Sequence, residues 1–557
     1  MKKILCLALA LVCAFASSCV FSSEDISKDV SKDISDVSED IAVTPAPVYD
    51  IDRIYIETDT DIVLEEYRPC SIRIVDIYGE SFEDTESKIK VRGNSTSSGE
   101  KKPYNFKLSG KTDILGLGSG KKWCLLANCY EKTLFRNEMV FAFARETVLA
   151  YTPDSRFVDV YLNDVLLGNY LLCEAVEAGE DRVDIDTDEN QFLLERDARE
   201  DEGTVYFESP VYGLRFGINE PEQVTDEQYK YLISFLSKAE NALQTRDIKK
   251  IEKYFDLPSM ADYYIIMEYF KQVDITVGST RFYIKDGKIY GGPVWDFDLT
   301  MGNCLDTYYL DYNNYYGSGL SYESIYCNVD WFRPLNKCAE FVELRNQRFL
   351  EFQQKIVNLY SETGEGESYI DTLLAQYGAS FDRNYTDAGW DVSRVYSTLE
   401  RVPDKTYEGN VEYLRNWLKQ RNSWLIKEWK LSKQAYVVPR SGTGVKLNGI
   451  YFHGLSEGVT PEECEDLFIY DVTVSASHKF VGTGSTVKNQ GFSYIFVVKG
   501  DISGNGKVDA NDYYTLLSAI NNPDSLKGAY FLAADINDDG ALTMEDYELL
   551  HQQVWEK

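Results

Sequence analysis

The sequence predicts an α+β fold for most of the chain, followed by a small β-sandwich module and a helical tail. Three observations support this. Short alternating apolar runs, typical of strands, dominate residues 52–218, and apolar residues at helical spacing dominate after Pro221. Residues 437–499 return to short strands separated by polar turns. From residue 500 to 557 a twelve-residue acidic loop occurs twice, each time before a helical segment.

The N-terminus predicts export. Residues 1–18 have the form of a secretory signal peptide, with two lysines before an apolar run and small residues after it. Alternatively, Cys19 ends an imperfect lipoprotein box and would be lipid-anchored. Residues 19–51 are rich in Ser, Asp and Lys, so we expect a disordered acidic linker. The favoured localisation is therefore secreted and extracellular.

Composition excludes several kinds of chemistry. The formal net charge of −34 argues against a nucleic-acid partner, because phosphates would be repelled. The three histidines, His453, His478 and His551, all follow residue 431, which excludes Ser-His-Asp catalysis and His-ligated metals for residues 52–431. The eight cysteines beyond the N-terminal region form no CxxC pair, so a zinc site is not expected, and one or two disulfides of unassigned pairing remain open.

An acidic hairpin is the central feature of residues 52–431. Asp286-Gly287 separates two runs of strand-forming residues, 280–285 and 288–295, and is a strong hairpin signal. Asp274 precedes the first run, and Asp296 and Asp298 follow the second. The hairpin should bring the three acids together, and a continuing strand would place Asp296 and Asp298 on one face. Such clusters hold a cation or share a proton. A solvated acidic loop is the alternative, but the interleaved aromatic residues favour a half-buried site.

A small-residue loop is a second candidate site. Residues 93–99 are Gly, Ser, Thr and Asn between two strands, with Arg92 before the loop and Lys102 and Lys107 after it. Backbone amides and a lysine in such a loop can hold phosphates, although most hairpin tips of this kind are only turns. Residues 131–149 predict a helix containing Glu138, and Glu174 ends an apolar strand.

Further segments are expected to be helical or aromatic. Helices are predicted over residues 226–244, 258–271 (with Ser259 as N-cap), 338–359, 368–377 and 410–431. A tyrosine-rich segment over 307–326 is either a sugar- or protein-binding loop or a packed surface loop.

The repeated C-terminal loops have the ligand spacing of calcium sites. Oxygen donors fall at the first, third, fifth, ninth and twelfth positions, with a glycine at the sixth and a backbone carbonyl at the seventh. The predicted ligands of two Ca²⁺ ions are Asp501, Ser503, Asn505, Lys507, Asp509 and Asp512, and Asp535, Asn537, Asp539, Ala541, Thr543 and Asp546, with Lys507 and Ala541 contributing their carbonyl groups.

Residues 500–557 resemble a type I dockerin. The resemblance implies a calcium-dependent fold that binds a cohesin domain of a scaffoldin and attaches the chain to a cellulosome-like, polysaccharide-degrading complex at the cell surface. The usual partner-contacting pairs would be Ala510-Asn511 and Met544-Glu545, and their mismatch leaves the cohesin class open.

Residues 52–431 resemble the spore-coat protein H (CotH) family. The resemblance rests on Arg92-Gly-Asn-Ser-Thr, Lys101-Lys-Pro-Tyr104, Leu134-Phe-Arg-Asn137, Gly168-Asn-Tyr-Leu-Leu-Cys-Glu174 and Pro293-Val-Trp-Asp-Phe-Asp-Leu-Thr-Met-Gly302, which occur in family order. It implies a two-lobed, atypical protein-kinase-like domain with a β-rich N-lobe and a helical C-lobe. It also implies transfer of phosphate from ATP to Ser or Thr of a protein, with Mg²⁺ or Mn²⁺.

By this resemblance Asp296 is a metal ligand with Asp298 beside it, and Asp274 is the catalytic carboxylate. Lys102, then Lys107, is the candidate phosphate lysine, and Arg92 also contacts phosphate. Glu138 and Glu174 are alternatives for the acid that pairs with the lysine or lines the nucleotide pocket.

One position departs from the family pattern. Arg281 stands where the family often has Asn, which places a second metal site in doubt. Two other functions therefore stay open: a non-catalytic adhesion or glycan-binding module, and a carbohydrate-active enzyme with paired acids.

Overall fold

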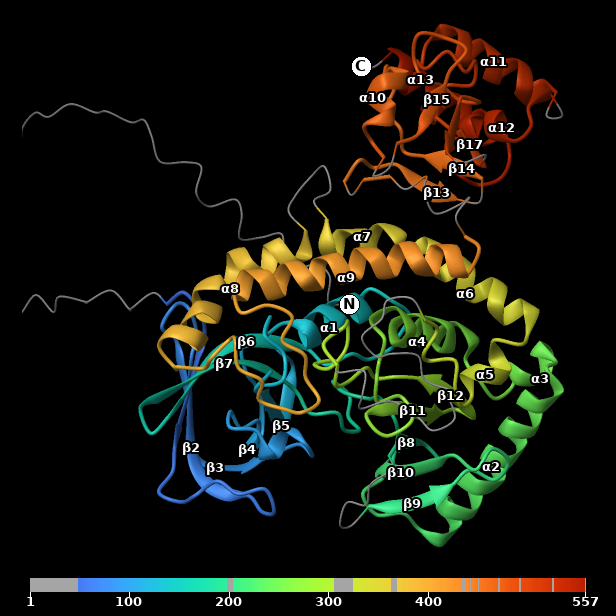
Figure 1. Cartoon of the computed structure of the whole chain (residues 1–557). Helices are drawn as coiled ribbons and strands as arrows, with labels where there is room; N and C mark the ends of the chain where they lie inside the picture. Colours follow the sequence, from blue (N-terminus) through green and yellow to red (C-terminus); the bar gives the residue numbers. More distant parts are fainter. Residues whose placement is uncertain are drawn as a thin grey trace, which may run out of the picture. The chain divides into compact units, whose positions relative to one another are not determined.

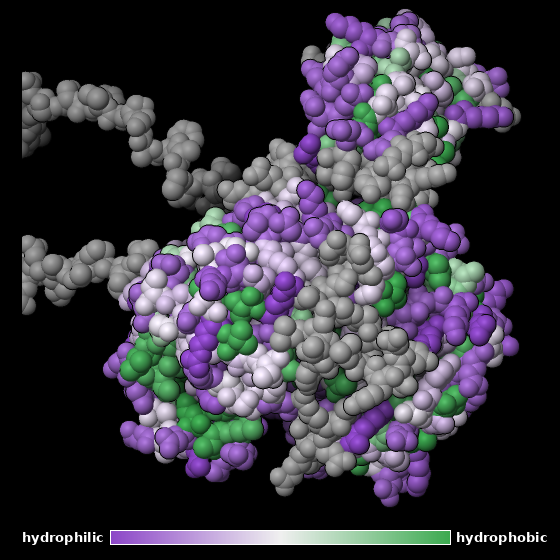
Figure 2. Space-filling view, viewed as in Figure 1, coloured by the Kyte–Doolittle hydropathy of each residue, from purple (hydrophilic) through white to green (hydrophobic). Residues whose placement is uncertain are grey.

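The computed structural model describes residues 49–197, 204–304, 324–361, 368–431, 437, 439–440, 442–448, 450–468, 471–489, 492–522 and 525–555. The predicted signal peptide, nearly all of the acidic linker and most of the tyrosine-rich segment lie outside these ranges. Among the described residues, no helix combines the length and apolar character needed to cross a bilayer. Hydrophilic residues predominate on the face shown in Figure 2, as the net charge of −34 leads one to expect.

The first half of the large domain is a closed β-barrel with the strand order β1-β2-β3-β4-β5-β7-β6 (Figure 1). Strands β1 and β6 close it as a parallel pair, with Arg53 opposite Asp159. Buried side chains fill the interior, among them Ile54, Phe106 and Trp123. The strands are β1 (Arg53–Glu57), β2 (Arg68–Val75), β3 (Ser81–Val91), β4 (Tyr104–Asp113), β5 (Ser119–Leu126), β6 (Ser155–Leu162) and β7 (Val165–Glu174).

The second half combines a five-stranded sheet with helices. The sheet order is β12-β11-β8-β10-β9. Helices α7, α8 and α9 run close together along one side of this domain (Figure 1). The elements are α1 (Arg136–Arg145), β8 (Phe192–Arg196), β9 (Val205–Glu208), β10 (Arg215–Glu220), α2 (Asp226–Thr245), α3 (Ile248–Ile251), α4 (Leu257–Phe270), β11 (Thr280–Lys285), β12 (Lys288–Gly291), α5 (Phe332–Leu335), α6 (Ala339–Glu351), α7 (Gln353–Tyr360), α8 (Tyr369–Thr386) and α9 (Tyr407–Glu428).

Helix α4 is the core of this half. Nearly all of its side chains are buried, including Tyr263 and Tyr264. It begins one residue earlier than the sequence indicates, because Asp256 and not Ser259 is the N-cap: the Asp256 carboxylate accepts from the backbone N–H of Ser259 at 3.0 Å. Helix α4 contacts β12 of the sheet, and Asp274 lies four residues after the end of the helix.

The module after residue 437 differs from the predicted sandwich. Its described strands form one sheet, in the order β13-β14-β17-β16-β15, with no second sheet facing it among these residues. The strands have only three to five residues, and helix α10 supplies the buried Cys464 to the same apolar cluster. The elements are β13 (Lys446–Asn448), β14 (Tyr451–His453), α10 (Pro461–Glu465), β15 (Thr473–Ser475), β16 (Thr486–Asn489) and β17 (Phe492–Phe496).

The tail is helical among its described residues. Its elements are α11 (Ala510–Asn521), α12 (Ala529–Ala534) and α13 (Met544–Trp555). The sequence predicts a helix after each repeated loop, over 513–520 and 547–554. Helices α11 and α13 cover these segments but each begins three residues earlier, inside the loop. The short helix α12, between the two repeats, was not predicted from the sequence.

Candidate functional sites

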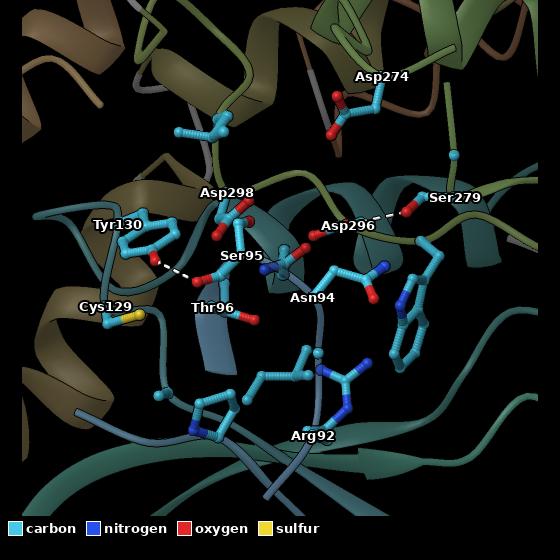
Figure 3. Close-up of a pocket in the computed structure, with 18 of the residues that line it drawn as sticks. Arg92, Asn94, Ser95, Thr96, Cys129, Tyr130, Asp274, Ser279, Asp296 and Asp298 are labelled. Atoms are coloured by element: carbon cyan, nitrogen blue, oxygen red, sulfur yellow. Dashed lines mark hydrogen bonds between the residues drawn. The ribbon is translucent and has the colours of Figure 1, made fainter. Parts of the chain in front are cut away.

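A cavity of about 710 Å³ is lined by residues of the barrel and of the second sheet (Figure 3). The barrel side consists of the end of β3, the loop over 93–96 and the segment 126–130. The other side consists of the end of β8 and the segments 274–279 and 295–299. Segments far apart in the sequence thus form one site.

Three aspartates line the same cavity. Asp274 follows α4, and Asp296 and Asp298 follow β12. Figure 3 shows them on the opposite side of the cavity from Arg92. Strand β12 ends at Gly291, four residues before the predicted end, because Pro293 has no N–H to continue the ladder. Asp296 and Asp298 therefore lie on irregular backbone and not on a continuing strand.

Side chains of α1 and of the segment after α4 hold this irregular backbone. The Gln272 amide donates to the carbonyl groups of Trp295 and Asp296 at 3.0 and 2.7 Å. Asn137 accepts from the N–H of Phe297 at 2.7 Å. Asp296 has a φ of +67°, a strained conformation for a residue with a side chain, and such strain often marks functional sites.

The carboxylates interact electrostatically. Burial raises the pKa of Asp298 well above its usual value, and the charges of Asp296 and Asp274 raise it further. Ser279 donates to Asp296 Oδ2 at 2.9 Å. No group of three or more His, Cys, Asp or Glu within the described ranges is gathered as a complete metal site. The arrangement fits Mg²⁺ or Mn²⁺ held by one or two carboxylates together with phosphate oxygens, which is the usual mode for Mg²⁺.

The barrel side of the cavity carries two basic side chains, Lys90 and Arg92, and one acidic side chain, Glu65. Lys90 lies near the end of β3, and Arg92 directly follows that strand. The Arg92 guanidinium lies 5.3 Å from the centre of the Trp295 ring. Asn105, opposite Lys90 on β4, has a buried Oδ1 with no hydrogen-bond partner. Two basic side chains facing three aspartates are a local concentration of positive charge in a chain whose net charge is −34.

Arg281, the departure from the family pattern, is held in an ion pair at the cavity. Its Nη2 lies 3.1 Å from both carboxylate oxygens of Glu195. Its guanidinium lies 5.3 Å from the centre of the Trp295 ring, as that of Arg92 does. Arg281, on β11, therefore contributes a cationic side chain and no oxygen ligand to the side of the cavity formed by the second sheet.

The other predicted residues lie outside the cavity lining. The Lys102 amine donates to the carbonyl of Ser97 at 2.7 Å. Lys107 is directly opposite Lys88 on β3 and so shares a face with Lys90, and its amine lies 4.3 Å from the centre of the Tyr67 ring. Their roles stay predictions.

The two candidate glutamates each pair with an arginine. Glu138, on α1, lies 2.7 Å from Arg145 and accepts from the Tyr369 hydroxyl at 3.1 Å. Glu174 pairs with Arg182, and burial raises the pKa of Glu174 to about 7. Among the described residues, neither glutamate forms an ion pair with a lysine, and the roles of both stay predictions.

Some lining residues were missed from the sequence. Lys90 could have been found, because it lies two positions before Arg92 in an alternating strand. Asn137 was noted only as part of a family motif and was given no role. Glu195 and Ser279 gave no signal, because only the tertiary fold brings them to the acids.

The two C-terminal loops have matching hydrogen bonds. Asp501 accepts from the backbone N–H groups of Asn505 and Gly506, both at 3.0 Å. In the second loop, Asp535 accepts from those of Asp539 at 3.1 Å and Gly540 at 2.9 Å. The sixth-position glycines have φ values of +81° and +83°.

The last aspartate of each loop is fixed in the same way. Asp512 accepts from the N–H groups of Ser503 and Asp509 at 2.6 and 2.8 Å. Asp546 accepts from that of Thr543 at 2.9 Å. Asp501 and Asp512 are fully buried, and burial together with the charge of Asp512 raises the pKa of Asp501. Two buried carboxylates so close together fit a bound Ca²⁺, which would neutralise them.

The fold and sites define the class: a large α+β domain with an acid-lined cavity, joined to a domain of paired calcium-type loops. The family model described as CotH kinase protein matches residues 89–425, more than half of the 557-residue chain, and the chain belongs to this family. The model described as Dockerin type I domain matches residues 499–555, and the chain carries this domain at its C-terminal end. No curated protein sequence matches the chain.

Proposed function

We propose that the chain is a secreted protein kinase that transfers phosphate from ATP to Ser or Thr of a protein, and that its dockerin attaches it to a scaffoldin cohesin at the cell surface. The kinase part of this proposal rests on one observation: Asp274, Asp296 and Asp298 face Lys90 and Arg92 across the same cavity. A metal-bound polyphosphate needs both walls, because the ion binds carboxylates while the phosphates bind cationic side chains.

Phosphoryl transfer requires positioned phosphates and an oriented hydroxyl, and no histidine. Asp274 would accept the proton of the substrate hydroxyl. The hydroxyl oxygen would then bond to the γ-phosphorus, and the bond between that phosphorus and the ADP oxygen would break. Asp296 and Asp298 would hold Mg²⁺ or Mn²⁺, which when bound neutralises phosphate charge. Arg92 would bind a phosphate, because its guanidinium lines the cavity and donates in a fork that matches phosphate oxygens.

The phosphate lysine is best sought on the face of β3 and β4 that carries Lys90, two residues before Arg92. Lys102 is turned to Ser97, whereas Lys107 lies on the same face as Lys90. Comparing Lys90→Met, Lys102→Met and Lys107→Met in ATP binding assigns the role to one of them.

Calorimetry of the purified chain with ATP and Mg²⁺ tests the kinase half. We expect binding by the wild type and at least roughly 100-fold weaker binding by Asp296→Ala, since the metal ion would lose a half-buried carboxylate ligand. Asp296→Ala should also abolish transfer of the labelled γ-phosphate from ATP to a protein. Asp188→Ala, at an exposed loop position, is the control. Equal binding by wild type and Asp296→Ala would contradict the proposal.

The dockerin half is tested by capture on immobilised cohesin domains with and without calcium. The two contact pairs differ, Ala510-Asn511 against Met544-Glu545, and Met544 is half exposed. We expect capture in calcium and its loss in a calcium chelator. A panel of cohesin types identifies the class of partner.

A further inference from the structure

The residues before the dockerin contact its first calcium loop. We call the described residues between 437 and 498 the β-module. We infer that the β-module is part of the first calcium site: it holds the loop Asp501 to Asp512 in the shape that the ion requires. This inference rests on the proposed binding of calcium by the dockerin, and it concerns residues outside the matched dockerin range of 499–555.

A backbone amide of the β-module binds the first ligand of the loop. The N–H of Thr483 donates to Asp501 Oδ2 at 2.9 Å, in addition to the donors from Asn505 and Gly506 within the loop. The Thr483 side chain is tied in turn to Val498, to which its hydroxyl donates at 3.1 Å. The carboxylate that opens the calcium loop is thus oriented partly from outside the dockerin.

The approach of the two segments requires glycine. A Cβ at Gly482 would lie 2.4 Å from both Asp501 Oδ2 and the Gly506 nitrogen, well inside contact distance. Gly482 does not have a positive φ, so an alanine there is compatible with its backbone and would act through crowding alone. Gly482 therefore gives a direct test of the contact.

Two further contacts involve the residues on either side of the seventh position of the loop. The N–H of Gly458 donates to the carbonyl of Gly506 at 2.8 Å, and the N–H of Val508 donates to Glu457 Oε2 at 2.7 Å. Lys507, whose carbonyl is the predicted calcium ligand, lies between these two anchored residues. Its ligand carbonyl is therefore held from both sides by the β-module.

An apolar contact supports these hydrogen bonds. Val497 of the β-module is buried with Ala529 and Ala533 of α12, and Tyr451 and Ile495 pack against them. The second loop is held differently: Asp535 accepts from Asp539 and Gly540 in its own loop, and a Cβ at Gly540 would meet no atom within 4 Å.

Groups that orient metal ligands affect affinity strongly. Removing such outer contacts typically weakens metal binding by about 10- to 100-fold. Gly482→Ala and Glu457→Ala should therefore weaken calcium binding at the first loop and leave the second loop unchanged. Glu462→Ala removes an exposed carboxylate on α10 and is the matched control for Glu457→Ala.

The experiment uses the full chain with one loop disabled at a time. In Asp535→Ala only the first loop remains intact, and in Asp501→Ala only the second. Calcium affinity is measured in each background by competition with a fluorescent chelator. We expect at least roughly 10-fold weaker binding at the first loop for Gly482→Ala and a smaller loss for Glu457→Ala. Affinity at the second loop and in Glu462→Ala should change by less than about twofold.

Each outcome decides the inference. Loss confined to the first loop supports it. Unchanged affinity in both variants, or equal loss at both loops, overturns it. If Gly482→Ala does not fold, Glu457→Ala, which changes only one side chain at the surface of the loop, decides alone. Calcium binding by the wild type is measured first. If the wild type binds no calcium, the proposed dockerin function is overturned, and the inference about the β-module falls with it.

Discussion

At the scale of single residues, Lys101 shows how the fold sets the charge of a side chain. Its amine is buried and donates to Asn384 Oδ1 at 2.8 Å and to the carbonyl of Asn169 at 2.5 Å. It also lies 4.6 Å from the centre of the Tyr170 ring. Burial lowers the pKa of Lys101 to about 7. Lys101 thus links the barrel to α8, and the burial that this position requires lowers the pKa of its amine.

This pKa predicts a pH dependence of stability. Between pH 7 and about 10.4 the unfolded chain holds a proton on Lys101 that the folded chain has released, so the free energy of unfolding rises with pH. The rise attributable to this residue reaches at most about 1.4 kcal/mol per pH unit. In thermal melts from pH 7.5 to 9.5, the stability of the wild type should increase relative to Lys101→Met. The exposed Lys405→Met is the control, and parallel curves for wild type and Lys101→Met would contradict the assignment.

The three cavity acids could be found from sequence because one local hairpin signal brings them together. The phosphate lysine could not be chosen, because Lys90, Lys102 and Lys107 are all near Arg92 along the chain and only strand pairing separates them. Glu138 and Glu174 were ambiguous for the same reason: their arginine partners, Arg145 and Arg182, are set by the tertiary fold.

At the scale of elements, the contact of β12 with α4 positions the acidic segment. A Cβ at Gly291 would lie 2.6 Å from Cβ of Tyr263, so the strand and the helix approach at a distance that only glycine allows. Gly291 is the last residue of β12, five positions before Asp296. Displacement of this strand end should therefore move the proposed metal ligands, Asp296 and Asp298.

Gly291→Ala tests this coupling. Overpacking of this kind typically costs about 1–3 kcal/mol of stability, and we expect weaker ATP binding in addition. Gly110→Ala, on β4, is the control, because a Cβ there would meet no atom within 4 Å. Normal ATP binding by a destabilised Gly291→Ala would show that the strand end does not position the acids.

Helices and strands with clear periodicity could be predicted, but their junctions could not. Helix α8 extends to Thr386, nine residues beyond its predicted end, because its later residues pack on the barrel: Ser380 and Arg383 both hydrogen-bond to Asp159 of β6. The single sheet of the β-module was also missed, because short alternating strands give the same pattern in one sheet or two.

At the scale of the whole molecule, the two parts for which we propose cation binding belong to one polypeptide with a net charge of −34. The large domain has its own apolar cores, in the barrel and around α4. The β-module and dockerin share buried residues and bonds to the first calcium loop. The unit for which we propose calcium dependence is therefore larger than the dockerin and comprises the described residues from 437 to 555.

Removing calcium should separate these parts in calorimetric melts of the full chain. Ligands that bind only the folded state stabilise it, by about 2.7 kcal/mol when present at 100 times their Kd. A calcium chelator should lower the melting temperature of the transition that contains residues 437–555 and leave the transition of the large domain in place. ATP with Mg²⁺ should raise the large-domain transition alone, and Asp296→Ala should abolish that rise. A single transition that responds to both ligands would mean that the two parts unfold together, and the calcium-dependent unit would then include the cavity.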